Sequence, residues 1–147
     1  MIYHLAFKGV YLKQTLHLVP ASSGVYSVHA GSLQGSTFIP RELLYIGESY
    51  NVRSRLMNHD KEANWAVHLL PGEVLGFNYA MTSADTRVRT EAALIYHHQP
   101  PVNIEYKNSF PFPETTISAS GKKLSIASNL SVSRPLPLMG LGLGRPQ

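Results

Sequence analysis

Short apolar segments alternate with stretches rich in glycine, proline and serine along most of the chain. Three of these segments carry many β-branched and aromatic residues and are bounded by turn-forming residues, a pattern typical of strands. They are residues 24–30 (Gly-Val-Tyr-Ser-Val-His-Ala), 43–47 (Leu-Leu-Tyr-Ile-Gly) and 74–81. We therefore predict three strands, and we expect the glycine- and serine-rich residues 31–40 to form a loop between the first two.

Helical patterns follow the second and third of these segments. Asn51 is a suitable N-cap for a short helix over residues 52–59, and a second helical piece is expected over 60–69. A longer helix is expected over 84–98, capped by Ser83 and ended by a Pro-Pro pair. The order strand, strand, helix, strand, helix predicts an α+β fold with a small antiparallel or mixed sheet.

The two ends of the chain differ from this central part. Residues 1–20 contain two further β-prone pieces, Ile2-Tyr3 and Thr15 to Val19. After Asn108 the composition shifts to proline, serine and glycine, which favours an irregular tail that is partly extended and partly mobile. We therefore divide the chain into a domain over 1–108 and a C-terminal extension over 109–147.

Charge is distributed unevenly along the chain. The net charge is +4, yet residues 1–106 hold equal numbers of basic and acidic residues, so the whole excess lies in the C-terminal quarter. A basic tail can bind phosphates without recognising sequence, or it can simply be solvated, and the charge alone leaves both open.

Other functions are excluded by what the composition lacks. There is no cysteine, which excludes disulfides, thiol catalysis and cysteine-ligated zinc. The chain shows neither a secretory signal nor an apolar stretch of membrane-spanning length, so we expect a soluble, cytoplasmic protein that does not contact membranes.

Glu91 is the first candidate for chemistry. On the expected helix, Ala84, Val88, Ala92 and Ile95 form an apolar stripe, and Glu91 lies on the same face. A carboxylate on an apolar face is costly unless it is paired or binds a metal. The residue is therefore either one partner of a structural ion pair, for example with an arginine, or a metal ligand.

A second group of candidates lies on the strands and the first helix. Arg55 and His59 are four residues apart and share one side of a helix, where they could hold a phosphate and position a proton carrier. Tyr26 and Tyr45 lie in strands that could bring them together, although tyrosine is common in strands. With Glu91, these residues contain the parts needed for metal-assisted phosphodiester hydrolysis.

These residues also occur in a familiar order. Gly24-Val25-Tyr26 resembles the GIY element of the GIY-YIG endonuclease family, with valine in place of isoleucine, and Tyr45-Ile46-Gly47 matches the YIG element. Arg55 follows Tyr45 by ten positions, as the arginine of this family does, and His59 is similar to the histidine of its homing-enzyme members. Glu91 resembles the glutamate of the family's later helix.

The resemblance covers residues 22–105, and within it Pro101-Val102-Asn103 resembles the family motif that ends in a buried structural asparagine. It implies a central three-stranded antiparallel sheet flanked by helices, with extra N-terminal strands and an irregular C-terminal tail. It also implies a metal-dependent endonuclease that hydrolyses DNA with one divalent cation, Mg²⁺ or Mn²⁺.

The resemblance assigns a role to each motif residue. Glu91 ligates the metal, Arg55 stabilises the transition state, and Tyr26 or Tyr45 accepts or relays the proton of the attacking water. His59 assists, because a free tyrosine has a pKa near ~10 and is a weak base at neutral pH.

Further residues are expected to shape the site or to bind the substrate. Gly24, Gly47 and Asn103 would be structural. The candidates for nucleic-acid binding are basic side chains outside the motifs: Arg53, Lys122 and Lys123.

Alternatives remain open at this point. Glu48 follows the YIG element where many members have a small or basic residue, which favours weaker DNA binding or an altered metal affinity. A non-cleaving module that binds nucleic acid or a protein partner is one alternative, and RNA as the substrate is another. Because little chain is left for a DNA-reading domain, specificity would come from a partner or a homodimer.

Overall fold

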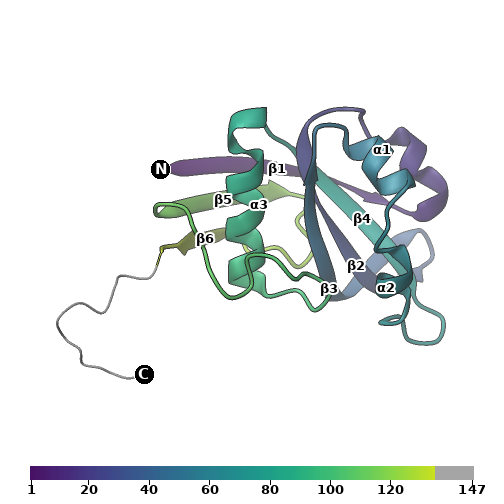
Figure 1. Cartoon of the computed structure of the whole chain (residues 1–147). Coiled ribbons are helices and arrows are strands. Elements are labelled where there is room, and N and C mark those ends of the chain that lie inside the picture. Colours follow the sequence, from purple (N-terminus) through teal and green to yellow (C-terminus); the bar gives the residue numbers. More distant parts are fainter. Residues whose placement is uncertain (135–147) are drawn as a thin grey trace, which may run out of the picture.

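A computed structural model describes residues 1–134. They form one six-stranded mixed sheet with the strand order β3-β2-β4-β1-β5-β6, together with the helices that pack on it (Figure 1). All neighbouring strands pair antiparallel except β1 and β5, which pair parallel. The elements in chain order are β1 (Ile2–Tyr11), the 3-10 helix η1 (Lys13–Leu18), β2 (Gly24–Gln34), β3 (Thr37–Ser49), α1 (Val52–Met57), α2 (Glu62–Ala66), β4 (Val74–Met81), α3 (Ala84–His98), β5 (Thr115–Gly121) and β6 (Asn129–Val132).

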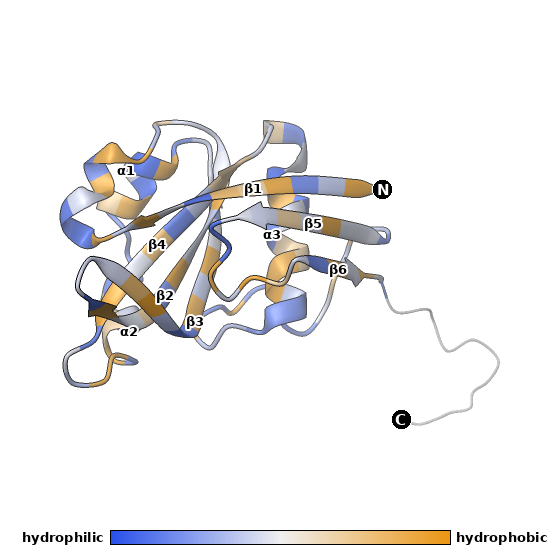
Figure 2. Cartoon of the chain, turned by 180° about the vertical axis from the view of Figure 1, so that it is seen from behind, coloured by the Kyte–Doolittle hydropathy of each residue, from blue (hydrophilic) through white to orange (hydrophobic). Residues whose placement is uncertain are grey.

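The predicted α+β class is confirmed, and β4 and α3 have the expected bounds. The expected central antiparallel trio corresponds to β3, β2 and β4, but these are half of a larger sheet rather than a complete one. Hydrophobic and hydrophilic bands follow one another along β1 (Figure 2), and its two buried residues, Leu5 and Phe7, lie two positions apart and so on one face of the strand.

The loop expected over residues 31–40 is wrong. β2 and β3 continue as a long hairpin that turns only at Gly35-Ser36. The buried ring of Phe38 explains the neighbouring glycines, because a Cβ on Gly31 would lie 2.7 Å from its Cζ atom and one on Gly76 only 2.5 Å. These glycines make room for an aromatic ring in a sheet and do not mark a loop.

Both chain ends also differ from expectation. Residues 15–19 are not a strand: Leu16 and Val19 are buried three positions apart, as suits the period of a 3-10 turn. The C-terminal extension is not irregular throughout, because β5 buries Thr115, Ile117 and Ala119 in alternation and pairs with β1. Small and polar inward-facing residues hid this strand pattern in the sequence.

The division at residue 108 stays a prediction, although the sheet runs across it. The expected basic tail lies partly outside the described residues, which end at Arg134. Among residues 1–134, no helix is long and apolar enough to cross a membrane.

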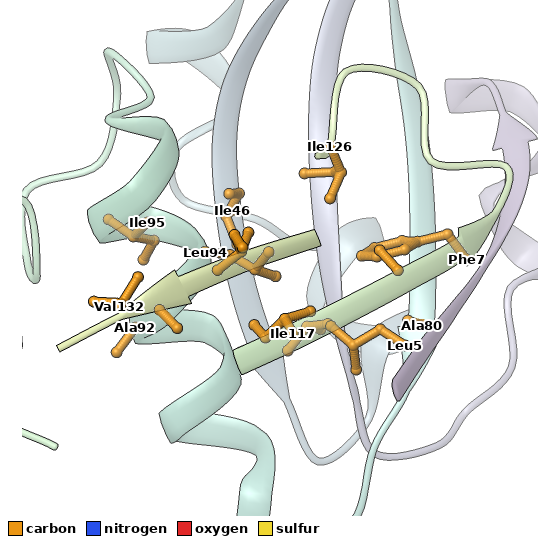
Figure 3. Close-up of a cluster of buried hydrophobic side chains, with 14 of the residues drawn as sticks. Leu5, Phe7, Ile46, Ala80, Ala92, Leu94, Ile95, Ile117, Ile126 and Val132 are labelled. Atoms are coloured by element: carbon orange, nitrogen blue, oxygen red, sulfur yellow. The ribbon is translucent and has the colours of Figure 1, made fainter. Parts of the chain in front are cut away.

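Two hydrophobic clusters stabilise the sheet from its two sides. One lies between α3 and the sheet and includes Ile46, Leu94 and Ile117, as Figure 3 shows. The other lies under η1, α1 and α2 and is centred on Trp65 and Phe77. Helices therefore cover both faces, and the segments that carry the candidate site residues are held by both clusters.

The apolar stripe expected on α3 is only half correct. Ala92 and Ile95 are buried, but Ala84 and Val88 are exposed. Burial is concentrated in the later turns of the helix, around Glu91, which is itself half-buried.

Candidate active site

The site is built around a close approach between the two strands of the long hairpin. Tyr26 of β2 pairs with Gly47 of β3, and a Cβ on Gly47 would lie 2.3 Å from the Tyr26 hydroxyl. Only glycine leaves room for the phenol ring at this position. Gly24 is similarly constrained, since its Cβ would meet the carbonyl oxygen of Ala80 at 2.6 Å. Gly47 thus makes room for Tyr26, and Gly24 makes room for the backbone of β4.

His59 is the partner of this tyrosine. The helix expected over 52–59 is shorter, since α1 ends at Met57, so His59 follows α1 and does not share a helix side with Arg55. Its Nε2 atom lies 2.7 Å from the Tyr26 hydroxyl. Burial, aided by the positive charge of Arg55, lowers the pKa of His59 to about 4, so the ring is neutral at pH 7. The backbone N–H of Lys61 donates to Nδ1 at 3.0 Å, which assigns the ring proton to Nε2. His59 therefore donates to the Tyr26 oxygen, whose own proton is left for another acceptor.

Tyr45 lies against this pair on the side of the cavity described below. Its ring centroid is 6.3 Å from that of Tyr26 and 5.3 Å from that of His59. Trp65 of α2 stacks obliquely on His59, with 4.5 Å between the ring centroids. Tyr26 is 1% exposed, whereas Tyr45 is half-buried, so Tyr45 is the tyrosine that solvent can reach.

Glu91 lines a cavity of about 260 Å³ together with Tyr45. Burial, with repulsion from Glu48 and Glu105, raises the pKa of its carboxyl to about 8. Within residues 1–134, Glu91 takes part in no ion pair. The first of the two alternatives for this residue, a structural ion pair, is therefore not found among the residues that the structure describes.

A divalent cation fits this environment. A half-buried carboxylate that is repelled by two other acids and has no basic partner gains from a nearby positive charge. Among the described residues, no group of three or more histidine, aspartate or glutamate side chains is arranged to hold a metal. Glu91 would thus be a single protein ligand, an arrangement that Mg²⁺ tolerates because it keeps waters and binds phosphate oxygens.

Arg55 is not among the residues that line the Glu91 cavity. Its Nη2 atom donates to Asp60 at 2.8 Å, and it borders a separate small hollow of about 220 Å³ with Tyr50 and Asn58. Its charge acts on the hydroxyl of Tyr26, where it opposes the rise in pKa that burial causes. Arg55 and Glu91 therefore line different cavities, although the charges of both act on Tyr26 and on Tyr45.

Asn103 fixes the YIG strand from outside the sheet. Its side-chain oxygen accepts from the backbone N–H of Ile46 at 2.9 Å, and its Nδ2 donates to the carbonyl oxygen of Ile46, also at 2.9 Å. Asn103 thus occupies the hydrogen-bonding positions that another strand would take on the edge of β3. This geometry gives the predicted structural asparagine a specific task.

Glu48 is engaged by a residue that the sequence analysis did not consider. Arg87 of α3 donates from Nε to Glu48 and from Nη1 to the hydroxyl of Ser23 at 2.8 Å. Arg87 therefore neutralises in part the carboxylate beside the YIG element. Through Ser23 it also ties α3 to the start of β2.

Weak homology connects the chain to known proteins. No protein-family model matches it, and no solved structure matches it significantly. Two curated relatives do match, and both are named UvrABC system protein C. The protein from Natronomonas pharaonis is 26% identical over 102 residues, which make up 69% of this chain and 16% of that protein. The protein from Gloeobacter violaceus is 30% identical over 117 residues, which make up 74% of this chain and 17% of that protein.

The chain is a distant homologue of UvrABC system protein C. It spans about one sixth of the length of these two relatives. The GIY-YIG resemblance of the motif residues and this homology are separate observations on the same chain.

The residues predicted to bind nucleic acid are not gathered at this site. Arg53 donates from Nε to the carbonyl oxygen of Val19 at 2.6 Å and so anchors α1. Lys122 follows β5 and borders a different cavity from that of Glu91, and the Lys123 ammonium contacts the Ser128 hydroxyl. Their role in nucleic-acid binding stays a prediction.

Sequence reasoning missed several residues of the site. Lys61 and Glu105 line the Glu91 cavity, Asp60 pairs with Arg55, and Trp65 packs on His59. None belongs to a recognised motif. Only Trp65 carries a usable signal, because a single tryptophan that follows closely after a candidate histidine in the sequence suggests a packing partner.

Proposed function

We propose that this chain is a metal-dependent endonuclease that hydrolyses phosphodiester bonds in DNA with one divalent cation. One observation carries the proposal: Tyr45 and Glu91 line the same cavity, and Tyr45 packs on the hydrogen-bonded Tyr26–His59 pair. A carboxylate for a cation and a solvent-reachable phenol are thereby brought to one place from β3 and α3.

The homology gives independent support. Similarity to UvrABC system protein C favours a nuclease role and DNA as the substrate class. The chain corresponds to a small part of those proteins, so a place in DNA excision repair is part of the proposal, as is any partner that would supply sequence specificity.

Glu91 would hold the cation, Mg²⁺ or Mn²⁺. A cation at this position supplies positive charge for the phosphate and for the oxygen that leaves. Because its pKa is raised to about 8, the Glu91 carboxyl is mostly protonated at neutral pH when no cation is bound. A bound cation would favour the charged form.

Tyr45 is the better candidate for contact with the attacking water, because Tyr26 is buried. Burial and the charge of Glu91 raise the pKa of Tyr45, while the charge of Arg55 opposes the rise. Tyr45 would therefore stay protonated and orient the water by a hydrogen bond, and the proton that the water loses would go to solvent. As the water oxygen bonds to phosphorus, one ester P–O bond breaks and the leaving oxygen takes up a proton.

Tyr26 and His59 would then hold the site in place and take no part in the reaction itself. Their 2.7 Å hydrogen bond fixes the Tyr26 ring over Gly47, and Trp65 fixes His59 in turn. Arg55 would stabilise charge on the phosphate, provided that the substrate competes with Asp60 for its guanidinium.

The test is cleavage of supercoiled plasmid and of labelled single-stranded DNA in Mg²⁺, Mn²⁺ or EDTA. The intact protein is expected to nick DNA only with a divalent cation. Glu91→Gln and Arg55→Ala should each lower kcat by roughly 100-fold or more, since each removes charge stabilisation from the transition state. Glu114→Gln, which changes an exposed acid in the loop before β5, is the matched control and should cleave normally.

The other outcomes distinguish the alternatives. Retained cleavage in Glu91→Gln would remove Glu91 from the mechanism. Faster digestion of matched RNA would change the substrate class. Salt-dependent binding without cleavage in any cation would instead favour a non-cleaving nucleic-acid-binding module.

A further inference from the structure

The Glu91 cavity contains a basic side chain that belongs to no motif. Lys61 precedes α2 and lines the cavity together with Tyr45 and Glu91. It is also half-buried, so its aliphatic stem lies along the wall of the cavity. Lys61 is the basic residue among those that line this cavity, and two of the others, Glu91 and Glu105, are acids.

The ammonium of Lys61 is not engaged by a carboxylate. Most of the arginines around the site are paired: Arg55 with Asp60, Arg87 with Glu48 and Arg41 with Glu73. Within residues 1–134, Lys61 forms no ion pair, although Glu91 and Glu105 line the same cavity. Lys61 is therefore a basic residue on the wall of the Glu91 cavity that no carboxylate of the described residues pairs with.

The backbone of Lys61 already has a separate task. Its N–H donates to His59 Nδ1 at 3.0 Å and fixes the tautomer of that ring. The chain therefore cannot move Lys61 away from the site without releasing His59. A substitution of the side chain leaves the N–H in place, so the two roles can be tested apart.

We propose that Lys61 is a substrate-positioning residue whose ammonium binds a non-bridging phosphate oxygen of the nucleic-acid strand in the Glu91 cavity. This inference rests on the proposed function and extends it to a residue outside the motifs. An ammonium is a compact charge with three donors on a flexible stem, which suits a phosphate without requiring one fixed geometry. Lys61 would thus hold the backbone of the strand beside Tyr45, while Glu91 accounts for the cation.

The experiment compares three variants with the intact protein. Lys61→Ala removes the charge, Lys61→Arg restores it, and Lys8→Ala removes an equal charge from an exposed position on β1, outside the cavity. Each protein is titrated with a fluorescein-labelled single-stranded DNA in EDTA at several salt concentrations, and cleavage of the same strand is then measured in Mg²⁺.

In the binding arm, Lys61→Ala is expected to weaken DNA affinity roughly three- to tenfold and to reduce the slope of log K against log salt by about 0.7, as loss of one phosphate contact should. In the cleavage arm, KM should rise by a similar factor while kcat changes little. Lys61→Arg should restore most of the affinity, and Lys8→Ala should resemble the intact protein.

Several results would overturn the inference. A Lys61→Ala variant that binds like Lys8→Ala would show that the side chain holds no phosphate. A fall in kcat at constant KM, unrescued by arginine, would show that the side chain affects the chemical step and does not bind the strand, because the N–H that fixes His59 is retained in both variants. Because binding is measured in EDTA, a protein that never cleaves but loses affinity and slope in Lys61→Ala would support Lys61 while refuting the nuclease.

Discussion

The two hydrogen bonds between Asn103 and Ile46 allow a quantitative test of how the site is held together. Asn103→Ala would leave the backbone N–H and C=O of Ile46 without their partners, and Ile46 is 0% exposed. A buried polar group that loses its partner costs about 1–3 kcal/mol. Two such groups therefore predict a loss of about 2–6 kcal/mol, a large share of the ~5–15 kcal/mol stability of an ordinary domain.

Urea denaturation followed by tryptophan fluorescence measures this directly, because the single tryptophan, Trp65, is buried in the cluster under α2. Asn108→Ala, at an exposed position nearby, is the control and should change stability by less than ~0.5 kcal/mol. If Asn103→Ala is as stable as this control, water or another group satisfies Ile46, and Asn103 does not hold the YIG strand.

Asn103→Asp sharpens the test through pH. When protonated, the new carboxyl can still donate to the Ile46 carbonyl oxygen and accept from its N–H, so it mimics asparagine. When ionised, it loses the donor and is buried against a carbonyl, so its folded-state pKa is raised above ~3.9. Because the folded-state pKa is raised, the stabilisation by this carboxyl is present below its unfolded-state pKa and is lost as the pH rises through its folded-state pKa. The difference in unfolding free energy from the intact protein should therefore grow between pH 4 and pH 7, and an equal difference at both pH values would refute the hydrogen-bond assignment.

Three further predictions follow from the same geometry. Gly47→Ala would put a methyl group 2.3 Å from the Tyr26 hydroxyl, so urea denaturation should show a loss of about 1–3 kcal/mol, and unchanged stability would mean that the ring moves freely. In EDTA, the raised pKa of Glu91 should make stability fall as pH rises from about 4 towards about 8, by at most ~1.4 kcal/mol per unit. Glu91→Gln should remove that slope, and a persisting slope would assign it to another group. Asp60→Asn should free Arg55 and tighten DNA binding roughly two- to fivefold at low salt, whereas weaker binding would show that Asp60 orients the guanidinium for the substrate.

Local patterns in the sequence predicted the elements that carry the motifs. β4 and α3 have their expected bounds because their flanking turn and cap residues are strong signals. The hairpin between the motifs was missed because its glycines are explained by Phe38, a residue that meets them only after the sheet has formed. β5 and β6 were missed for a related reason, since small and polar side chains carry little hydrophobic alternation.

The site shows the same division between local and distant information. The motif spacing placed Tyr26, Tyr45 and His59 in one region, and the structure brings them into contact. Spacing could not supply the separation of Arg55 from the Glu91 cavity, since that depends on how α1 and α3 pack on opposite faces of the sheet.

The residues that no motif contains are those that set the electrostatics of the site. Glu48 and Glu105 raise the pKa of Glu91, and Asp60 occupies Arg55. Each charge acts across elements that are distant in sequence, so its effect depends on packing and not on spacing. A chain could keep every motif residue and still lose function if these charges changed. Conversely, exchanging Glu48 for a neutral residue should lower the pKa of Glu91 and release Arg87 towards it. The motifs therefore define which groups can react, while the surrounding charges decide the protonation state in which they meet a substrate.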